Sequence, residues 1–337
     1  MTYKVTIQPG GHEFTAHKNE SLLEAGLRAG YNLRYQCDNG SCGECQSRLI
    51  SGQTEVINFS DYAISEADKL RGQFLLCASQ AASDLIIEAE LCDRAADMPE
   101  QNIVARVKKI ERLQHGIIVL QLRTPRTNTL RFLAGQSASL TVGDDRVKQL
   151  EIASCPCNGM VLEFHVRHIE NDAFSEYVFT QLSMNDEVVV EGPSGDFTLN
   201  ETTARPLLFI AYDTGFASIK SLIEHAIALE IPQAMYLYRI ACDPAEDYMH
   251  NICRSWSDAI DNFHYQPFEH CAPIDCSDSD KAKVCGRLLS VLDHGDDQLI
   301  AKSEVYLSGI DEMIENLGDA LCKKGLPPDQ LHTQRVY

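Results

Sequence analysis

The sequence is poor in positive charge, because its 337 residues include 29 Lys and Arg against 49 Asp and Glu, a formal net charge of −20. It also lacks an apolar run near the roughly 18 residues of a membrane-spanning helix, and its opening, MTYKVTIQPGG, lacks the apolar centre of a signal peptide. An acidic surface repels nucleic-acid phosphates and anionic lipids. These absences argue against nucleic-acid binding and membrane insertion, and they predict a cytoplasmic protein.

Several catalytic signatures are missing as well. The sequence contains no convincing Ser/His/Asp triad, HExxH zinc motif, Walker loop or general acid–base pair, which argues against hydrolase and kinase functions. It shows no internal repeat and no low-complexity segment. The composition, 44% hydrophobic and 23% charged, is that of a globular protein, and the length predicts two or three domains of about 150 residues each.

Cysteine, in contrast, is abundant, with 13 residues. Cys37, Cys42 and Cys45 stand in YQCDNGSCGECQS as C-x4-C-x2-C, and Cys77 follows in FLLCASQ. This is the spacing of a plant-type [2Fe–2S] cluster. Zinc is the alternative, but zinc sites usually show two short paired spacings. We therefore predict that these four cysteines hold a [2Fe–2S] cluster.

Glycines between these cysteines fit the same chemistry. A tight loop must aim three thiolates and several backbone N–H groups at an anionic cluster, and Gly40 and Gly43 permit the backbone angles and close approach that this needs. The other cysteines lack such a pattern, and in a reducing compartment a disulfide framework is not expected. Core packing is the preferred interpretation for Cys92, Cys155, Cys157, Cys242, Cys253, Cys271, Cys276, Cys285 and Cys322.

The hydrophobic pattern predicts a multidomain α+β and α/β chain with four segments. Residues 1–92 combine short strands with one or two helices around the cysteine loop, and the polar residues 93–101 are a linker candidate. Residues 102–200 contain evenly spaced strand-like runs, which predict an antiparallel β-barrel or sandwich. Residues 201–337 alternate apolar strands with helical patterns, which predicts a parallel sheet of the nucleotide-binding kind. The last segment is the most acidic, since residues 196–337 hold 23 acidic and 11 basic residues, net −12.

In this order, a plant-type ferredoxin, a barrel and an α/β domain resemble the ferredoxin-type NAD(P)H oxidoreductases. This family includes the reductase components of phenol hydroxylase and methane monooxygenase and CDP-6-deoxyglucoseen reductase. The resemblance implies a β-grasp ferredoxin fold, FAD in the barrel and NAD(P)H in the last domain. It also implies a flavin that accepts two electrons as a hydride and passes them one at a time to the cluster. The cluster then reduces a partner oxygenase or dehydratase. Glu191–Phe197 (EGPSGDF) and Leu133–Gln136 (LAGQ) match family motifs well, and Phe164–Arg167 lies where the family lines the flavin with backbone.

The flavin motif of the family, R-x-Y-S, falls on altered residues. Lys148 replaces the arginine that holds the pyrophosphate and loses its bidentate fork. Leu150 replaces the tyrosine that stacks on the flavin, Glu151 replaces the serine near its reactive nitrogen, and Ser154 ends the motif. In the turn that cradles the pyrophosphate, Ser175 is retained but Asp172 replaces a glycine, and a carboxylate repels a diphosphate.

The nicotinamide motif also loses glycines and gains a carboxylate. The family's G-G-T-G loop appears as Tyr212-Asp213-Thr214-Gly215, and the late Cys-Gly appears as Ser308-Gly309. Together these changes predict an iron–sulfur electron-transfer protein on an oxygenase-reductase scaffold, passing single electrons to or from a protein partner, whose reductase half has lost binding of FAD, NAD(P)H or both. The alternative is an active reductase that moves electrons from NAD(P)H through FAD to the cluster. If a nucleotide binds, the candidate contacts are Lys148, Ser154, His165, Arg167, Ser175, Thr214 and Gly215. The redox partner is expected to be an oxygenase, a dehydratase or a separate reductase.

Overall fold

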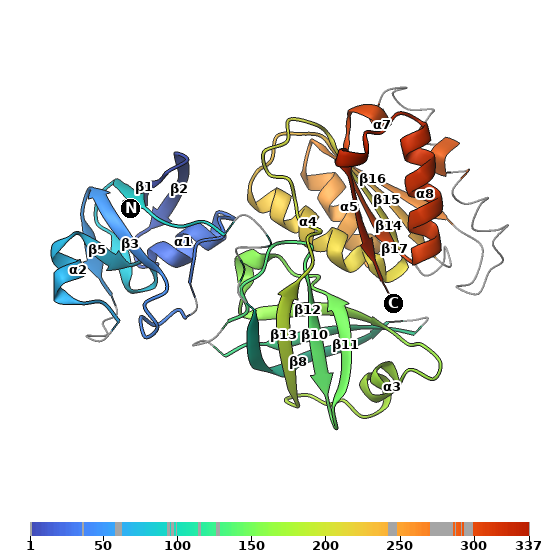
Figure 1. The fold of residues 1–337 in the computed structure, drawn as a ribbon, viewed down its shortest axis with the longest axis horizontal. Helices are drawn as coiled ribbons and strands as arrows, with labels where there is room; N and C mark the ends of the chain where they lie inside the picture. The colour runs from blue at the N-terminus through green and yellow to red at the C-terminus, as the bar shows by residue number, and fades with distance from the viewer. Residues whose placement is uncertain are drawn as a thin grey trace.

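The computed structural model describes residues 2–35, 37–57, 63–92, 95, 98, 100–113, 116–125, 129–241, 248–269, 286, 288–290, 292 and 299–336. Three main sheets divide the chain into an N-terminal part, a central barrel and a C-terminal part, as the sequence predicts (Figure 1). The N-terminal part lies to one side, and the barrel and the C-terminal part pack on each other. Most of the predicted linker 93–101 lies outside the described residues, and Gln101 begins the first barrel strand.

The N-terminal part, residues 2–92, is a mixed sheet of strand order β2-β1-β7-β3-β5. Strand β1 pairs antiparallel with β2 and parallel with β7, and helix α1 packs against η1 and the sheet. Ser21 and Glu24 form a capping box that fixes the start of α1. The elements are β1 (Thr2–Gln8), β2 (His12–His17), α1 (Leu22–Arg28), β3 (Gln46–Ser51), β4 (Thr54–Val56), α2 (Glu66–Leu70), β5 (Gln73–Leu75), η1 (Leu76–Ala78), β6 (Ser79–Ala81) and β7 (Leu85–Glu88).

The central part is a curled antiparallel sheet of order β11-β10-β13-β8-β9-β12. A bridge between Ile152 and Phe164 joins its two edges, so the sheet curls into a barrel around one apolar core. The strand pattern of β11 is the least evident in the sequence, because its exposed half is polar. The elements are β8 (Gln101–Leu113), β9 (Ile117–Arg123), β10 (Ser137–Val142), β11 (Arg146–Glu151), η4 (Pro156–Asn158), β12 (Val161–Arg167), α3 (Ala173–Thr180) and β13 (Glu187–Ser194).

The C-terminal part is a parallel sheet of order β16-β15-β14-β17-β18, which confirms the prediction from alternating strands and helices. Strand β14 is buried along its whole length, as its continuous apolar run predicts. Helix α4 lies between this sheet and the barrel (Figure 1). The elements are β14 (Leu207–Tyr212), η5 (Asp213–Gly215), α4 (Phe216–Ala228), β15 (Met235–Ala241), α5 (His250–Ala259), β16 (Phe263–Glu269), α7 (Leu299–Lys302), β17 (Glu304–Gly309), α8 (Asp311–Lys323), η7 (Pro328–Gln330) and β18 (Leu331–Arg335).

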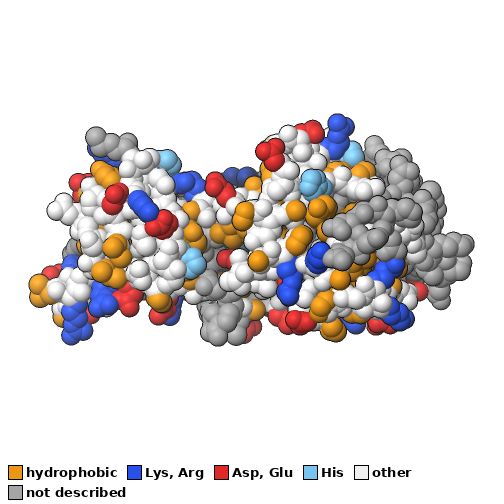
Figure 2. All heavy atoms as spheres, turned by 90° about the horizontal axis from the view of Figure 1, so that it is seen from above, with side chains coloured by type: hydrophobic (Ala, Val, Ile, Leu, Met, Phe, Trp, Pro, Cys, Tyr) orange, Lys and Arg blue, Asp and Glu red, His pale blue; other side chains and the backbone are white. Residues whose placement is uncertain are grey.

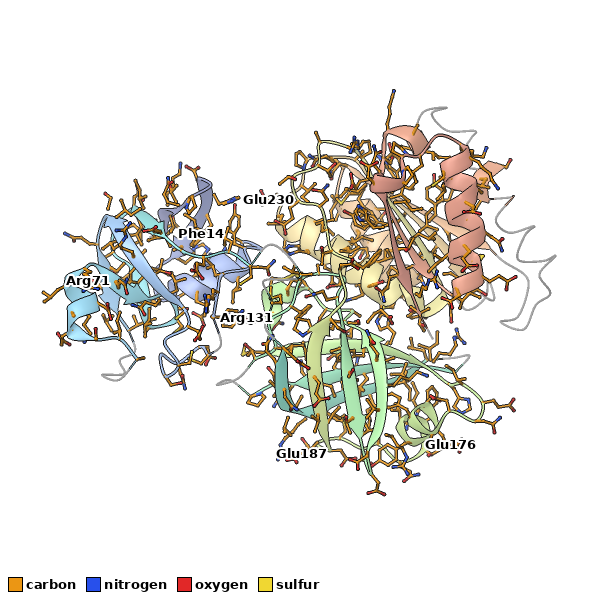
Figure 3. All side chains as sticks on the ribbon, viewed as in Figure 1. Phe14, Arg71, Arg131, Glu176, Glu187 and Glu230 are labelled. Carbon is orange, nitrogen blue, oxygen red and sulfur yellow. A yellow bond between two sulfur atoms is a disulfide. The ribbon has the colours of Figure 1, made fainter. Side chains whose placement is uncertain are left out.

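A buried arginine joins the N-terminal part to the barrel. Arg131 is 8% exposed and lies where the two parts meet (Figure 3). Its Nη1 donates to the Tyr35 carbonyl at 2.5 Å, and its Nη2 contacts Cys92 Sγ at 3.8 Å. Tyr35 is itself buried, and its hydroxyl lies close to Gly159 of the barrel. These contacts hold the segment just before the cysteine loop against the barrel.

The surface carries charge of both signs. On the face shown in Figure 2, acidic and basic side chains are scattered between apolar ones and gather in no single patch. Within the part of the chain that the structure describes, no helix has the length and apolar character to cross a membrane.

Candidate functional site

The four predicted cluster cysteines lie together at one end of the N-terminal sheet. Cys37, Cys42 and Cys45 come from the loop between α1 and β3, and Cys77 lies in η1. Antiparallel pairing of Gln46 with Leu75 brings the two segments side by side. As a result, Cys45 Sγ and Cys77 Sγ lie 3.2 Å apart although 32 residues separate them.

Backbone N–H groups point at the loop thiols. The N–H of Cys42 donates to Cys37 Sγ at 3.4 Å, and the N–H of Glu44 donates to Cys42 Sγ at 3.5 Å. Gly43 has a φ of 83°, and a Cβ there would lie 2.8 Å from the Ala63 carbonyl oxygen, so only glycine fits. Burial alone would raise the pKa of Cys37, but hydrogen bonds from Cys42 and Ser41 lower it to about 7, which favours the thiolate.

The thiols group as two pairs, Cys37 with Cys42 and Cys45 with Cys77. Among the described residues, no group of three or more His, Cys, Asp or Glu side chains is arranged around a single metal ion. A binuclear cluster takes two thiolates on each iron, so the paired arrangement fits [2Fe–2S] better than zinc. Cys42 is exposed and the other three thiols are buried, so the cluster would face solvent on the Cys42 side.

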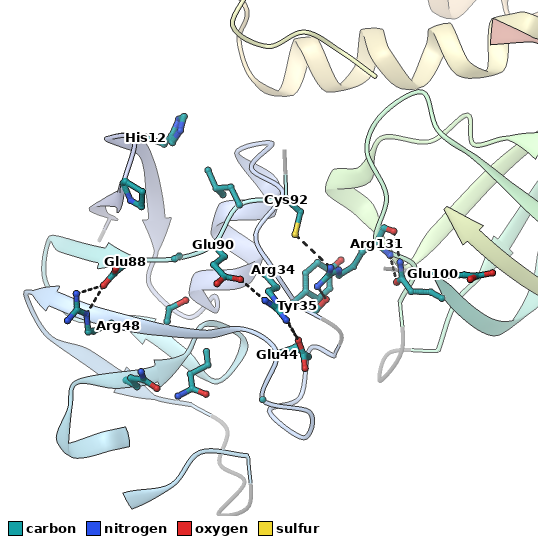
Figure 4. A pocket seen from close by; sticks show the side chains of 18 of the residues that line it. His12, Arg34, Tyr35, Glu44, Arg48, Glu88, Glu90, Cys92, Glu100 and Arg131 are labelled. Carbon is teal, nitrogen blue, oxygen red and sulfur yellow. Dashed lines mark hydrogen bonds and ion pairs between the residues drawn. The ribbon is translucent and has the colours of Figure 1, made fainter. Parts of the chain in front are cut away.

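A groove of about 1570 Å³ lies beside this loop, between the N-terminal part and the barrel (Figure 4). Arg34 crosses it with ion pairs to Glu90 at 2.6 Å and to Glu44, in the cysteine loop, at 3.1 Å. Arg131 closes its barrel side. The groove therefore presents paired charges of both signs next to the cluster loop.

In the barrel, the structure brings Lys148 and Ser175 together around a carboxylate. Asp172 caps α3, and its Oδ2 accepts from the Ser175 N–H at 2.9 Å and from Lys148 Nζ at 3.0 Å. The Ser175 hydroxyl donates within the chain to the Ile169 carbonyl at 3.2 Å. The helix N-terminus and the cation that could bind a phosphate are thus occupied by Asp172.

Arg167 meets a second carboxylate at the interface between the barrel and the C-terminal part. Its Nε and Nη2 both donate to Asp213, and both side chains are largely buried. Asp213 has a φ of 50°, a conformation that favours glycine, and it follows β14 directly. Gly215 packs against β17, since a Cβ there would lie 2.6 Å from the Ser308 carbonyl oxygen. Thr214 is buried in the same turn.

His165 belongs to a buried polar network at this interface. Its Nδ1 lies 3.1 Å from the Tyr248 hydroxyl, and its Nε2 lies 3.3 Å from Glu163 Oε1. Lys220 of α4 pairs with Glu163 at 3.2 Å and with Glu224 at 2.7 Å. Burial lowers the pKa of His165, so its imidazole is neutral near pH 7. The network joins the barrel to the C-terminal part, and within it the Lys220 ammonium lies between the carboxylates of Glu163 and Glu224.

The candidate Ser154 and the motif residue Tyr212 both make internal contacts. Ser154 accepts from the Glu163 N–H at 3.2 Å, and its carbonyl accepts from Ser221 of α4 at 2.8 Å, so its contacts are internal. Tyr212 is 2% exposed and packs on Gly309, where a Cβ would lie 2.8 Å from its own Cβ.

Glu151 is buried at the end of β11, where its Oε1 accepts from Gln334 of β18 at 3.3 Å. Burial raises its pKa to about 7, against the opposing effects of its hydrogen bonds and of Lys148. Because the native pKa is raised above its ordinary value of 4.5, the native state binds the proton more tightly than the unfolded chain. Its contribution to stability is complete below about pH 4.5 and is lost as pH rises through 7.

Replacing Glu151 with glutamine should therefore stabilise the protein at about pH 8, by on the order of 3 kcal/mol, and change little at about pH 5. Glutamine keeps the acceptor for Gln334 and removes the buried charge. Denaturant unfolding at the two pH values measures the difference, with the exposed Glu176→Gln as the matched control. An equal effect of Glu151→Gln at both pH values would show that the buried charge is not the cause.

Sequence reasoning missed several residues of this interface. Lys220 and Tyr248 belong to no motif, and neither does Arg239, whose Nη1 donates to the Tyr248 carbonyl at 2.6 Å. A lysine on the apolar face of the 216–228 helix is nevertheless a detectable irregularity. The interpretation of Cys155 and Cys157 as packing residues is wrong, because the structure joins them in a disulfide. Cys242, Cys271, Cys276 and Cys285 lie outside the described residues or have no described side chain.

Comparisons with known proteins agree with the geometry of the cysteine loop and the barrel. Residues 5–82 match the family described as "2Fe-2S iron-sulfur cluster binding domain", and residues 104–199 match "Oxidoreductase FAD-binding domain". The chain is 30% identical over 267 residues to CDP-6-deoxy-L-threo-D-glycero-4-hexulose-3-dehydrase reductase of Yersinia pestis, covering 79% of this chain and 80% of that protein. It is 27% identical to the reductase component of propane 2-monooxygenase of Mycolicibacterium smegmatis, covering 98% and 96%.

Solved structures show the same fold. The cytochrome P450 reductase GcoB of Amycolatopsis superposes with a TM-score of 0.62 at 22% identity, covering 99% of this chain and 98% of that one. The ferredoxin reductase of carbazole 1,9a-dioxygenase gives a TM-score of 0.58 at 22% identity, covering 100% and 99%. All three parts of the chain therefore have counterparts, in the same order, in known redox proteins.

Proposed function

The chain belongs to the family of ferredoxin-type oxidoreductases. From that membership and its own side chains we propose that it is a [2Fe–2S] electron-transfer protein whose reductase half has lost binding of FAD, NAD(P)H or both. It passes single electrons to or from a protein partner, which is an oxygenase, a dehydratase or a separate reductase. Relatives named as reductase components of monooxygenase and dehydrase systems support partners of this kind.

The observation that carries the loss of flavin is the site around Asp172. A flavin pyrophosphate would need Lys148 and the N-terminus of α3, and the Asp172 carboxylate already accepts from both Lys148 and the Ser175 N–H. A pyrophosphate would have to displace this carboxylate and then remain beside it, which costs electrostatic energy. Glu151 adds a buried carboxyl at the position where the family places a serine near the flavin.

The nicotinamide position supports the same proposal. Asp213 lies in the loop after β14, where parallel α/β sheets usually bind a nucleotide. Its carboxylate accepts hydrogen bonds from Nε and Nη2 of Arg167. Tyr212 packs on Gly309 beside it. The negative charge of residues 196–337, net −12 from 23 acidic and 11 basic residues, opposes an anionic dinucleotide over a longer range.

The cysteine loop supplies what electron transfer requires. When bound, a [2Fe–2S] cluster accepts and releases one electron at a time. Cys37, Cys42, Cys45 and Cys77 would hold it, and the N–H groups of the loop would stabilise its negative charge. The exposed side of the loop at Cys42 is where a partner would approach, and the net charge of −5 on residues 1–92, from 12 acidic and 7 basic residues, would steer a basic partner.

The alternative function is an active NAD(P)H reductase. It is favoured by the match of residues 104–199 to an FAD-binding domain and by relatives named as reductases. In that case FAD would take Lys148 and Ser175 as ligands and move Asp172 aside. NAD(P)H would likewise have to separate Asp213 from Arg167.

Cofactor release distinguishes the two functions. Protein purified without oxygen is denatured, and the supernatant is examined for FAD fluorescence; the native protein is then mixed with NADH or NADPH and cytochrome c. We expect an iron–sulfur spectrum, no stoichiometric FAD and no nucleotide oxidation. Added FAD should also separate from the protein on a desalting column. Equimolar FAD together with rapid cytochrome c reduction would establish the active reductase instead.

A further inference from the structure

Cys155 and Cys157 form a disulfide across the single residue Pro156. The pair begins the short helix η4, which leads from the end of the β11 strand segment to β12. Neither cysteine belongs to the cluster site or to the ion pairs at the interface. Intracellular disulfides are rare, and those that exist are usually catalytic or redox-sensing.

The pair lies where all three parts of the chain meet. On one side, η4 packs against α1 of the N-terminal part, and Pro156 lines a small cavity with Leu27, Leu33 and Tyr35. On the other side, η4 packs against α4 of the C-terminal part. A change in the backbone of η4 would therefore reach both neighbours.

Hydrogen bonds from α4 hold the chain just before the pair. Ser221 Oγ donates to the Ser154 carbonyl at 2.8 Å, and Lys220 Nζ donates to the Ala153 carbonyl at 3.2 Å. The backbone just before Cys155 is thus anchored to α4, and η4, which follows, packs against both α1 and α4.

The two sulfurs differ in access and in surroundings. Cys155 is 7% exposed, and Cys157 is only half-buried, so an attacking thiolate reaches Cys157 more easily. The Cys157 N–H donates to Cys155 Sγ at 3.3 Å, a contact that stabilises Cys155 as the leaving thiolate. Accessible disulfides of this kind are the labile ones.

We propose that Cys155 and Cys157 are a reversible redox site that exchanges with an external dithiol, and that its state controls how firmly the N-terminal part is held against the barrel. One thiolate of the dithiol attacks Cys157 Sγ, the bond to Cys155 breaks, and Cys155 takes up a proton. The second thiol of the reductant then resolves the mixed disulfide and releases Cys157 as a thiol. The pair gains two electrons and two protons, and the external dithiol becomes a disulfide.

The expected consequence follows from the position of Pro156. In the reduced state the two sulfurs are no longer bonded and must separate to van der Waals distance, which moves η4 between its two neighbours. Because α4 anchors the two residues before Cys155, the movement falls on Pro156 and Cys157, and Pro156 lies next to Leu27 and Tyr35. The docking of α1, and with it the segment that leads into the cysteine loop, becomes looser. The proposal does not depend on whether the barrel binds FAD.

Mass spectrometry tests the redox state directly. The tryptic peptide of residues 149–167 contains Cys155 and Cys157 and no other cysteine. Holoprotein alkylated under denaturing conditions without reductant should yield this peptide unmodified and two hydrogens lighter than the dithiol. After incubation of the native protein with dithiothreitol, it should carry two alkyl groups. Two alkyl groups without prior reduction would overturn the proposal.

Hydrogen exchange tests the structural consequence. Dithiothreitol should raise amide exchange severalfold in α1, and Cys157→Ser should do the same without reductant. Cys322→Ser, in α8, is the matched control and should leave α1 unchanged. The cluster absorbance, followed in the same samples, separates this effect from loss of iron. Equal exchange of α1 in the oxidised, reduced and Cys157→Ser proteins would contradict control of docking.

Discussion

Replacing Cys77 with alanine is expected to reduce the iron content from about two atoms per chain to near zero and to abolish the iron–sulfur absorption of the purified protein. Cys77 is the ligand that closes the site, since it lies in η1 and meets Cys45 at 3.2 Å across the β3–β5 pair. Without it, one iron keeps a single protein thiolate and the cluster is lost. Since metal binding contributes to folding, the N-terminal part should also unfold at lower denaturant concentration.

The matched control is Cys322→Ala, which removes a thiol far from the loop in α8 and should retain the full cluster. Iron and acid-labile sulfide are measured on both variants, together with visible absorption and circular dichroism. A Cys77→Ala protein that keeps both irons, or a wild-type protein that is colourless and contains stoichiometric zinc, would contradict the assignment of the four cysteines.

The second large effect concerns the buried pair of Arg167 and Asp213. Asp213→Ala should lower the free energy of unfolding by about 3 to 5 kcal/mol, because it leaves the guanidinium buried without its carboxylate. The Arg167 side chain is 11% exposed and that of Asp213 is 3% exposed, so water cannot replace the lost partner without opening the interface. Arg167→Met should also be strongly destabilising, because it leaves the Asp213 carboxylate buried without the guanidinium.

The double variant Arg167→Met/Asp213→Ala completes the cycle. It should recover most of the stability that Asp213→Ala loses, because it buries neither charge. Trp256, the single tryptophan, packs on Phe216 and Phe263 in the C-terminal part, so its fluorescence reports unfolding of the region that contains Asp213. If the double variant loses as much free energy of unfolding as the two single variants together, the two side chains do not stabilise each other.

The fold and the cluster site could be predicted from the sequence because both depend on local patterns. Thiolates of one loop stay close together, and Gly40 and Gly43 mark the turn that aims them. The continuous apolar run at Leu207–Tyr212 indicates a buried parallel strand without knowledge of its neighbours.

The ion pairs could not be predicted in the same way. Lys148 and Asp172 are 24 residues apart on different elements, and Arg167 and Asp213 are 46 apart across two parts of the chain. A resemblance identified the positions of these residues, but it could not show that each cation has a carboxylate of the same chain as its partner. The network of His165, Lys220 and Tyr248 likewise depends on how α4 packs on the barrel.

The carboxylate of Asp172 at the start of α3 also has a consequence for how the protein matures in a cell. A barrel that binds FAD is stabilised by the flavin, so its stability in a cell follows the riboflavin supply. In this chain Asp172 supplies the anion that Lys148 and the helix terminus require. On the proposed function, the stability of the barrel does not depend on the flavin supply, and the working protein depends on iron and sulfide instead.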